Sequence, residues 1–203
     1  MIVWSIHDLA FFKKLEKAKV IYPNKKKLTW RKDFMDSYLW LANQMDKRIG
    51  GRPHPTAVPF WAWYQFKDAD HKKPDLRIRC HLDAGQQGVR LELDIPDNQI
   101  VLTDFDIWCD VLNKQYIPES YDDYEEFYRI PDKKKQFGYE NWSKARQKRA
   151  EKSWQKVFDL DFFIENNFYR PRAEKTIQAT FWKLSIDQIQ NITHFTARKP
   201  AEL

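Results

Sequence analysis

The sequence lacks the short motifs by which many nucleotide-binding and hydrolytic enzymes can be predicted from a single chain. It has no glycine-rich phosphate loop, no G-x-G-x-x-G turn, no H-E-x-x-H helix and no G-x-S-x-G elbow. Only five residues are glycine, so little bare backbone is available to approach a cofactor closely. These absences argue against the common nucleotide hydrolases and dehydrogenases.

Cysteine and histidine are also sparse and widely spaced. Cys80 and Cys109 form no C-x-x-C pair, and both lie in stretches with apolar periodicity, so we expect small buried side chains in a thiol-reducing compartment. No two histidines stand at metal-ligand spacing, and we expect no metal cofactor. The five histidines are His7, His54, His71, His81 and His194.

Long apolar runs are missing as well. No stretch of eighteen apolar residues and no targeting segment can be found. We therefore expect a cytoplasmic chain that has no membrane partner.

Aromatic residues, by contrast, are abundant. They make up 16% of the 203 residues, and nine of them are Trp. Rings of this size must fill much of the interior, but the Trp N–H and Tyr O–H groups need hydrogen-bond partners. We expect most rings to lie in a core and some to line a groove.

Charge is unevenly distributed along the chain. The net charge is +6, which permits binding to nucleic acid without requiring it. Residues 133–156 carry nine basic side chains and two acidic ones, whereas residues 119–126 carry five acids and no base. The basic run is either a solvated helix face or a phosphate-binding surface. Its candidate nucleic-acid-binding residues are Lys133, Lys134, Lys135, Lys144, Arg146, Lys148 and Arg149.

Apolar periodicity predicts four helical segments. Asp8 is placed to cap the first helix, Thr29 the second, and Thr103 or Asp104 the third, which continues to Leu112. The fourth is a basic amphipathic helix over residues 143–158. Residues 116–136 are acidic and rich in tyrosine, and we expect an irregular excursion with one helical turn.

Alternating or aromatic runs predict the strands. The six runs span residues 1–6, 60–66, 76–80, 89–95, 100–102 and 175–184, and residues 192–195 could add an edge strand. Together these elements predict one α+β domain, residues 1–203, whose mixed but mainly antiparallel central sheet is flanked by helices, with an excursion at 116–158.

Several of these segments resemble an uncharacterised bacterial family described only as a domain of unknown function (DUF3841). The resemblance covers nearly the whole chain and implies a cytoplasmic bacterial or phage setting, but it implies no mechanism. The segments that carry it are residues 1–6, 38–45, 59–63, 102–108, 153–159 and 177–182.

A second, weaker resemblance is to the ADP-ribosyltransferase superfamily, which similarly opens with a strand and a helix. The resemblance implies NAD as cofactor, with a first-strand residue holding the ribose and a central-strand residue beside the nicotinamide. The matching cofactor-binding positions are Ser5 or His7 and Trp63 or Tyr64.

In that superfamily a late strand supplies a catalytic Glu, and the matching position here is Gln178. A neutral amide cannot stabilise a developing ribosyl cation as a carboxylate does. Asp104 or Asp106 could supply that charge from a neighbouring element, but capping of a helix explains this acidic pair equally well. Gln178 could equally be a polar residue on the solvent face of a strand.

Three functional hypotheses remain open. The chain could bind NAD in an aromatic cleft where Ser5, Tyr64 and Gln178 converge. It could bind nucleic acid through the basic run, with exposed Trp142 or Tyr139 as stacking platforms. It could instead dock a basic protein partner on the acidic segment at 121–128.

Overall fold

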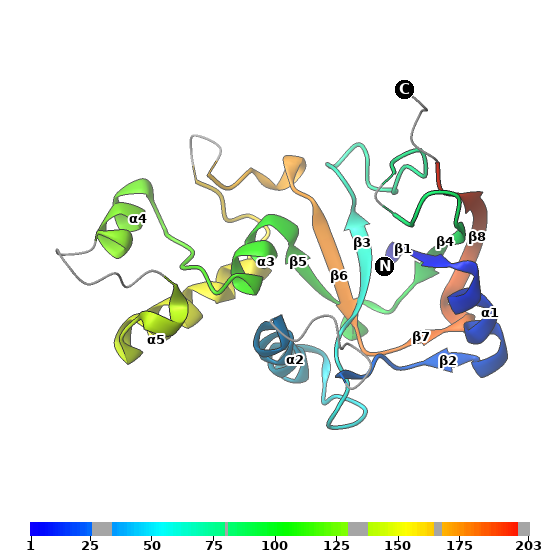
Figure 1. The fold of residues 1–203 in the computed structure, drawn as a ribbon, viewed down its shortest axis with the longest axis horizontal. Helices are drawn as coiled ribbons and strands as arrows, with labels where there is room; N and C mark the ends of the chain where they lie inside the picture. Colours follow the sequence, from blue (N-terminus) through cyan, green and yellow to red (C-terminus); the bar gives the residue numbers. More distant parts are fainter. Residues whose placement is uncertain (26–33, 80, 130–137, 165–167, 199–203) are drawn as a thin grey trace.

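The protein is described here by a computed structural model that covers residues 1–25, 34–79, 81–129, 138–164 and 168–198. A six-stranded sheet forms its centre, in the spatial order β5-β6-β3-β1-β4-β8 (Figure 1). All pairings between these strands are antiparallel. The strands are β1 Ile2–Asp8, β3 Phe60–Gln65, β4 Gln87–Asp94, β5 Val101–Asp104, β6 Ile177–Phe181 and β8 Ile189–Thr196.

The described residues also form five α-helices and a short two-stranded ladder, which confirms the α+β prediction. The ladder pairs β2 with β7 next to α1 (Figure 1). The helices are α1 Leu9–Ala18, α2 Met35–Ile49, α3 Phe105–Leu112, α4 Tyr121–Tyr128 and α5 Lys144–Ser153, and the ladder strands are β2 Val20–Ile21 and β7 Leu184–Ser185.

The two faces of the sheet are buried by different helices. One face packs with Phe12 and Leu15 of α1 in a first core cluster, which includes Val3, Phe60 and Leu91. A second cluster joins Val101 of β5 to α2, α3 and the 3₁₀ segment Trp154–Phe158. Because side chains alternate along each strand, both faces of the central strands are covered, which explains their continuous apolar and aromatic runs.

Asp8 and Asp104 cap helices as the sequence predicts, and Ser143, the first residue of the predicted fourth helix, is a further cap. Asp8 accepts a hydrogen bond from the Phe11 amide at 2.6 Å, and Ser143 caps α5 by accepting from the Arg146 amide at 3.3 Å. Asp104 caps α3 by accepting from the amides of Asp106 and Ile107. Each cap satisfies a backbone donor that the first helical turn leaves free. Thr29 lies outside the described residues.

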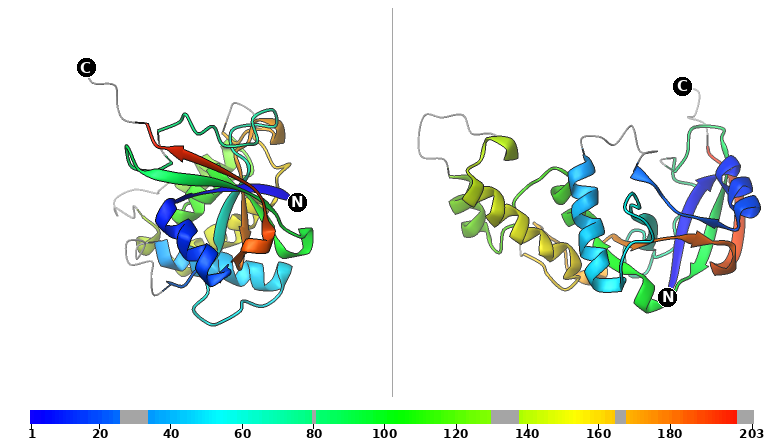
Figure 2. Two further views of the ribbon diagram at one scale, coloured as in Figure 1. Left: turned by 90° about the vertical axis from the view of Figure 1, so that its right-hand side faces the viewer. Right: turned by 90° about the horizontal axis from the view of Figure 1, so that it is seen from below.

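Helices α4 and α5 extend away from the sheet as a pair (Figures 1 and 2). They bury a third cluster of their own, Tyr116, Phe127, Trp142 and Ala150. The excursion is therefore more regular than predicted, because α4 forms two turns and α5 continues into a 3₁₀ segment.

The strand prediction for residues 76–80 is wrong for the part that is described. The Asp75 side chain accepts from the Arg77 amide, and the Ile78 amide donates to the Asp75 carbonyl, so the chain turns here. A further strand would also find no free edge on β4, because β1 and β8 already pair with both of its sides.

The predicted strand at 175–184 is shorter and is divided. Its first part, β6, ends at Phe181, and its second part, β7, leaves the central sheet to pair with β2. The predicted edge strand is confirmed by β8, which pairs along β4.

Candidate functional site

The central sheet consists of two three-stranded halves that meet at a narrow seam. Strands β1 and β3 pair at one position, Trp4 opposite Trp63, whereas β1 and β4 pair along seven residues, from Ile2 to Asp8. No other registered pair joins these two strands in the part of the chain that the structure describes. The seam is therefore the place in the sheet where backbone hydrogen bonding leaves room for a cavity.

A cavity of about 230 Å³ lies at this seam, and we call it the seam cavity. Strands β1, β3 and β6 bring three of the predicted cofactor-site residues, Ser5, Trp63 and Gln178, to its wall. The connection between β3 and β4 adds Phe66 and His81. The complete lining is Ser5, Ile6, Trp61, Ala62, Trp63, Phe66, His81 and Gln178.

Register explains how these side chains meet. Gln178 lies opposite Trp63 on one side and Thr103 on the other, so the three side chains share one face of the sheet. Trp61 shares this face because it is two residues from Trp63. The Trp63 ring also meets the rings of Phe66 and Phe105 edge-on, with centroids 5.2 and 5.5 Å away, which fixes its position.

Three polar atoms on the lining residues have no hydrogen-bond partner among the described residues. They are Nε1 of Trp61, a donor, Oε1 of Gln178, an acceptor, and Oγ of Ser5, which can do both. An unpaired buried polar group costs about 1–3 kcal/mol, so such groups are uncommon unless they serve a purpose.

His7 and Tyr64, two further predicted cofactor-site residues, do not line the seam cavity. Tyr64 packs against the first core cluster. The His7 ring stacks on the Phe11 ring with centroids 4.2 Å apart, and it meets the Phe60 ring edge-on with centroids 5.5 Å apart. Burial lowers the pKa of His7 to about 4, with the nearby Asp8 opposing the shift, so the imidazole is neutral near pH 7.

The His7 pKa makes stability depend on pH. Because the folded-state pKa is below the ordinary value, the unfolded chain binds more protons between about pH 6.5 and 4. We expect the contribution of His7 to be complete above pH 6.5 and to fall by about 2 kcal/mol between pH 7 and 5. Urea unfolding at both values should show this loss, and His7→Phe should reduce it. His194→Gln, at an exposed histidine, should keep the wild-type pH dependence. If wild type, His7→Phe and His194→Gln all lost the same stability between pH 7 and 5, His7 would not be the source of the pH dependence.

Asp104 and Asp106, proposed to replace the missing catalytic charge, also lie outside the seam cavity. The Asp104 carboxylate is committed elsewhere, because Oδ1 caps α3 and Oδ2 pairs with Nζ of Lys175 at 2.5 Å. Burial, and then repulsion from Asp104, raises the pKa of Asp106. Both acids thus belong to the start of α3, where Asp104 caps the helix and pairs with the buried Lys175.

Two arginines in the described part of the basic run bind groups of the acidic helix α4. Arg149 pairs with Asp123 at 2.7 Å and Glu126 at 3.0 Å, both on the acidic helix α4. Arg146 donates to the Phe127 carbonyl at 2.6 Å and lies over the Phe127 ring. The acidic and basic segments thus bind each other.

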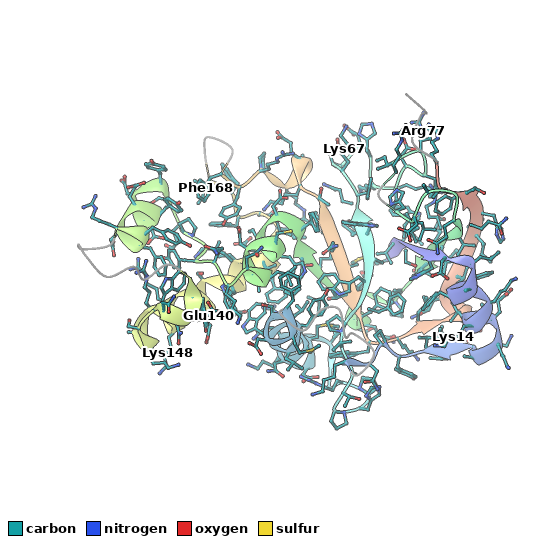
Figure 3. All side chains as sticks on the ribbon, in the orientation of Figure 1. Lys14, Lys67, Arg77, Glu140, Lys148 and Phe168 are labelled. Carbon is teal, nitrogen blue, oxygen red and sulfur yellow. The ribbon has the colours of Figure 1, made fainter. Side chains whose placement is uncertain are left out.

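Of the other candidate nucleic-acid-binding residues, the two that the structure describes, Lys144 and Lys148, are exposed. Lys144 donates to Gln147, and Lys148 points outward from α5 (Figure 3). Lys133, Lys134 and Lys135 lie outside the described residues. Trp142, expected to be exposed, is buried in the third core cluster, because rings at the α4–α5 interface must be shielded from water.

Sequence reasoning missed Trp61, His81 and Lys175. Trp61 could have been found, because period-two alternation places it on the same face as Trp63. No local pattern indicates His81, which reaches the cavity from a turn, or Lys175, whose partner Asp104 is 71 residues away.

The described residues hold neither a metal-ligand cluster nor a candidate membrane span. No three His, Cys, Asp or Glu side chains in these residues gather closely enough to hold a metal ion. Among the described helices, none has the length and apolar character that crossing a bilayer requires.

Comparison with known proteins identifies a family but gives no function. No curated protein and no solved structure matches the chain, so the resemblance to ADP-ribosyltransferases gains no support from them. The family described as "Domain of unknown function (DUF3841)" matches residues 2–190. That match spans both halves of the sheet and the helical pair, and the chain therefore belongs to this family.

Proposed function

We propose that the seam cavity binds the flat ring of a nucleotide, and that NAD, through its nicotinamide, is the first candidate. The observation that carries the proposal is the chemistry of the cavity wall. Trp61, Trp63 and Phe66 offer aromatic surface for stacking, and Trp61 and Gln178 each hold a buried polar atom, a donor and an acceptor, that lacks a partner among the described residues. A carboxamide on a flat ring presents the complementary acceptor and donor.

The size of the cavity supports capture of a single ring. Sites that enclose a whole small molecule measure roughly 300–1,000 Å³, and the seam cavity is smaller, at about 230 Å³. A ring can enter while the rest of a dinucleotide remains outside. Most of the binding energy would then come from stacking and from the two hydrogen bonds.

Basic residues stand close to the cavity along the chain. Lys67 follows the lining residue Phe66 directly, and Arg79 precedes the lining residue His81 by two positions; both are exposed (Figure 3 labels Lys67). Cations at these places would attract the phosphates of a nucleotide whose ring is bound.

The proposal concerns binding and includes no ribosyl transfer. A carboxylate would be needed to stabilise an oxocarbenium-like centre, and the lining residues include none. Gln178 has the role of an amide that recognises another amide.

A thermal-shift and calorimetric titration tests this function. NAD and nicotinamide mononucleotide should stabilise the folded chain by about 2.7 kcal/mol at one hundred times Kd, whereas ADP-ribose, which lacks the nicotinamide, should bind much more weakly. Trp63→Ala and Gln178→Ala should abolish the NAD effect. Lys67→Ala combined with Arg79→Ala should weaken NAD binding but leave nicotinamide binding unchanged.

Controls separate recognition from loss of folding. Tyr22→Ala and Gln190→Ala remove an exposed ring and an exposed amide outside the cavity, and both should bind NAD as wild type does. Equal stabilisation by ADP-ribose and NAD would overturn the role of the ring. Stabilisation by a single-stranded oligonucleotide alone, fading with salt, would instead favour the nucleic-acid hypothesis.

A further inference from the structure

A second cavity, of about 340 Å³, is lined by residues of α2, of α5 and of the segments that flank α5, and it shares no lining residue with the seam cavity. Its walls carry the rings of Trp40, Tyr139 and Trp154, and Asp36 and Glu151 also line it. We call it the aromatic–acidic groove.

The rings of this groove belong to a continuous aromatic ladder. Phe158 stacks on Trp40 with centroids 5.8 Å apart, and Trp40 meets Trp154 edge-on at 5.5 Å. Trp154 lies 6.1 Å from Tyr139. At the Phe158 end, the guanidinium of Arg48 lies 3.9 Å above the ring. One cation of the chain is therefore already held by the face of a ladder ring.

At the opposite end, the ammonium of Lys114 occupies the groove. Nζ lies 5.4 Å from the Tyr139 ring centre, 3.3 Å from Asp36 and 3.5 Å from Glu140. Lys114 follows the end of α3 with a φ of 56°, a conformation that favours glycine or asparagine. A lysine at this position carries backbone strain that a glycine would not.

The charges around the groove are unbalanced. Asp36 and Glu151 line it, and Glu151 accepts from the Tyr139 hydroxyl. Glu140 stands next to the groove, and Lys114 is the ammonium paired with Asp36 and Glu140. The side chains of Asp36 and Glu140 are 80% and 71% exposed, so they can reach a ligand that arrives from solvent. In a chain whose net charge is +6, this is a local negative site bordered by rings.

We propose that the aromatic–acidic groove binds a lysine or arginine side chain from a basic segment of a partner protein, and that Lys114 occupies this place until the partner displaces it. Rings attract a cation through their negative faces, and the exposed carboxylates add charge-assisted hydrogen bonds. Lys114 itself shows that the cationic end of a protein side chain fits. Carboxylates spread along the rim suit neighbouring basic residues on the same segment better than they suit an isolated amine.

The test uses a fluorescein-labelled peptide of alternating lysine and glycine, with a fully acetylated twin as the neutral probe. Fluorescence anisotropy should detect binding of the first and none of the second. Lys114→Gly removes the internal cation at a position where glycine relieves strain, and it should tighten binding about fivefold. The double variant Asp36→Asn with Glu151→Gln should weaken binding about tenfold.

A matched variant, Asp122→Asn with Glu16→Gln, removes two exposed carboxylates elsewhere and should bind as wild type. The proposal is overturned if this variant weakens binding as much as the groove variant, or if the acetylated peptide binds equally. It is also overturned if Lys114→Gly leaves affinity unchanged while the circular dichroism spectrum remains that of wild type. Peptide binding at the groove can fail while nucleotide binding at the seam cavity succeeds, and the reverse, because the two sites share no residue.

Discussion

Lys175→Met is expected to lower the free energy of unfolding by about 3–5 kcal/mol, one of the two largest effects that the structure predicts. The Lys175 side chain is 1% exposed and that of Asp104 is 3% exposed. Nζ of Lys175 donates to Asp104 at 2.5 Å and to the Phe162 carbonyl at 2.6 Å. Removing the ammonium leaves a buried carboxylate without its counter-charge, and desolvation makes that state costly.

Urea unfolding followed by tryptophan fluorescence measures this loss. Asp104→Asn is the informative partner variant, because asparagine also caps helices well and only the charge is removed. It should destabilise by a similar amount, and the double variant should lose less than the sum, because the two residues act as one pair. Lys13→Met, at an exposed position on α1, is the control. A loss below about 1 kcal/mol for Lys175→Met would show that the pair is not buried as described.

Gly88→Ala is expected to cost about 3 kcal/mol, the upper end for overpacking a filled interior. A Cβ at Gly88 would collide with Cδ1 of Leu82, approach the His7 carbonyl oxygen to 2.8 Å and reach Phe195 at 3.0 Å. The His7 oxygen belongs to the strand that pairs with β4, so it cannot move without disturbing the sheet.

Gly51→Ala is the matched control, because a Cβ there meets nothing within 4 Å. We expect its stability to stay within about 0.5 kcal/mol of wild type. Chemical denaturation of both variants, at equal protein concentration, compares one added methyl group in a filled and in an open position. Similar stabilities for the two variants would contradict the close packing of Leu82, His7 and Phe195 around Gly88 of β4.

Local structure followed the sequence where the cause is local. Asp8 and Asp104 cap the helices as predicted, because a cap needs only its own side chain and the next three amides. The strand around Trp63 and the helix around Leu41 were likewise readable, because apolar periodicity reports which face is buried.

Predictions that depend on a distant partner succeeded only in part. Residues 76–79 alternate like a strand but turn, because both sides of β4 are already paired. Arg146 and Arg149 form part of a basic run, yet both bind partners on α4. Neither outcome can be obtained from a local pattern, since each requires knowledge of which elements are neighbours.

The candidate site shows the same division. The sequence by itself determined the α+β class, the helix caps, the aromatic strands and, by resemblance, the positions of Ser5, Trp63 and Gln178. Only the tertiary structure decided that these three border one cavity while His7 and Tyr64 do not, and that Asp104 is bound to Lys175. The physical reason is that strand order and register bring together residues far apart in the sequence, which no local propensity encodes.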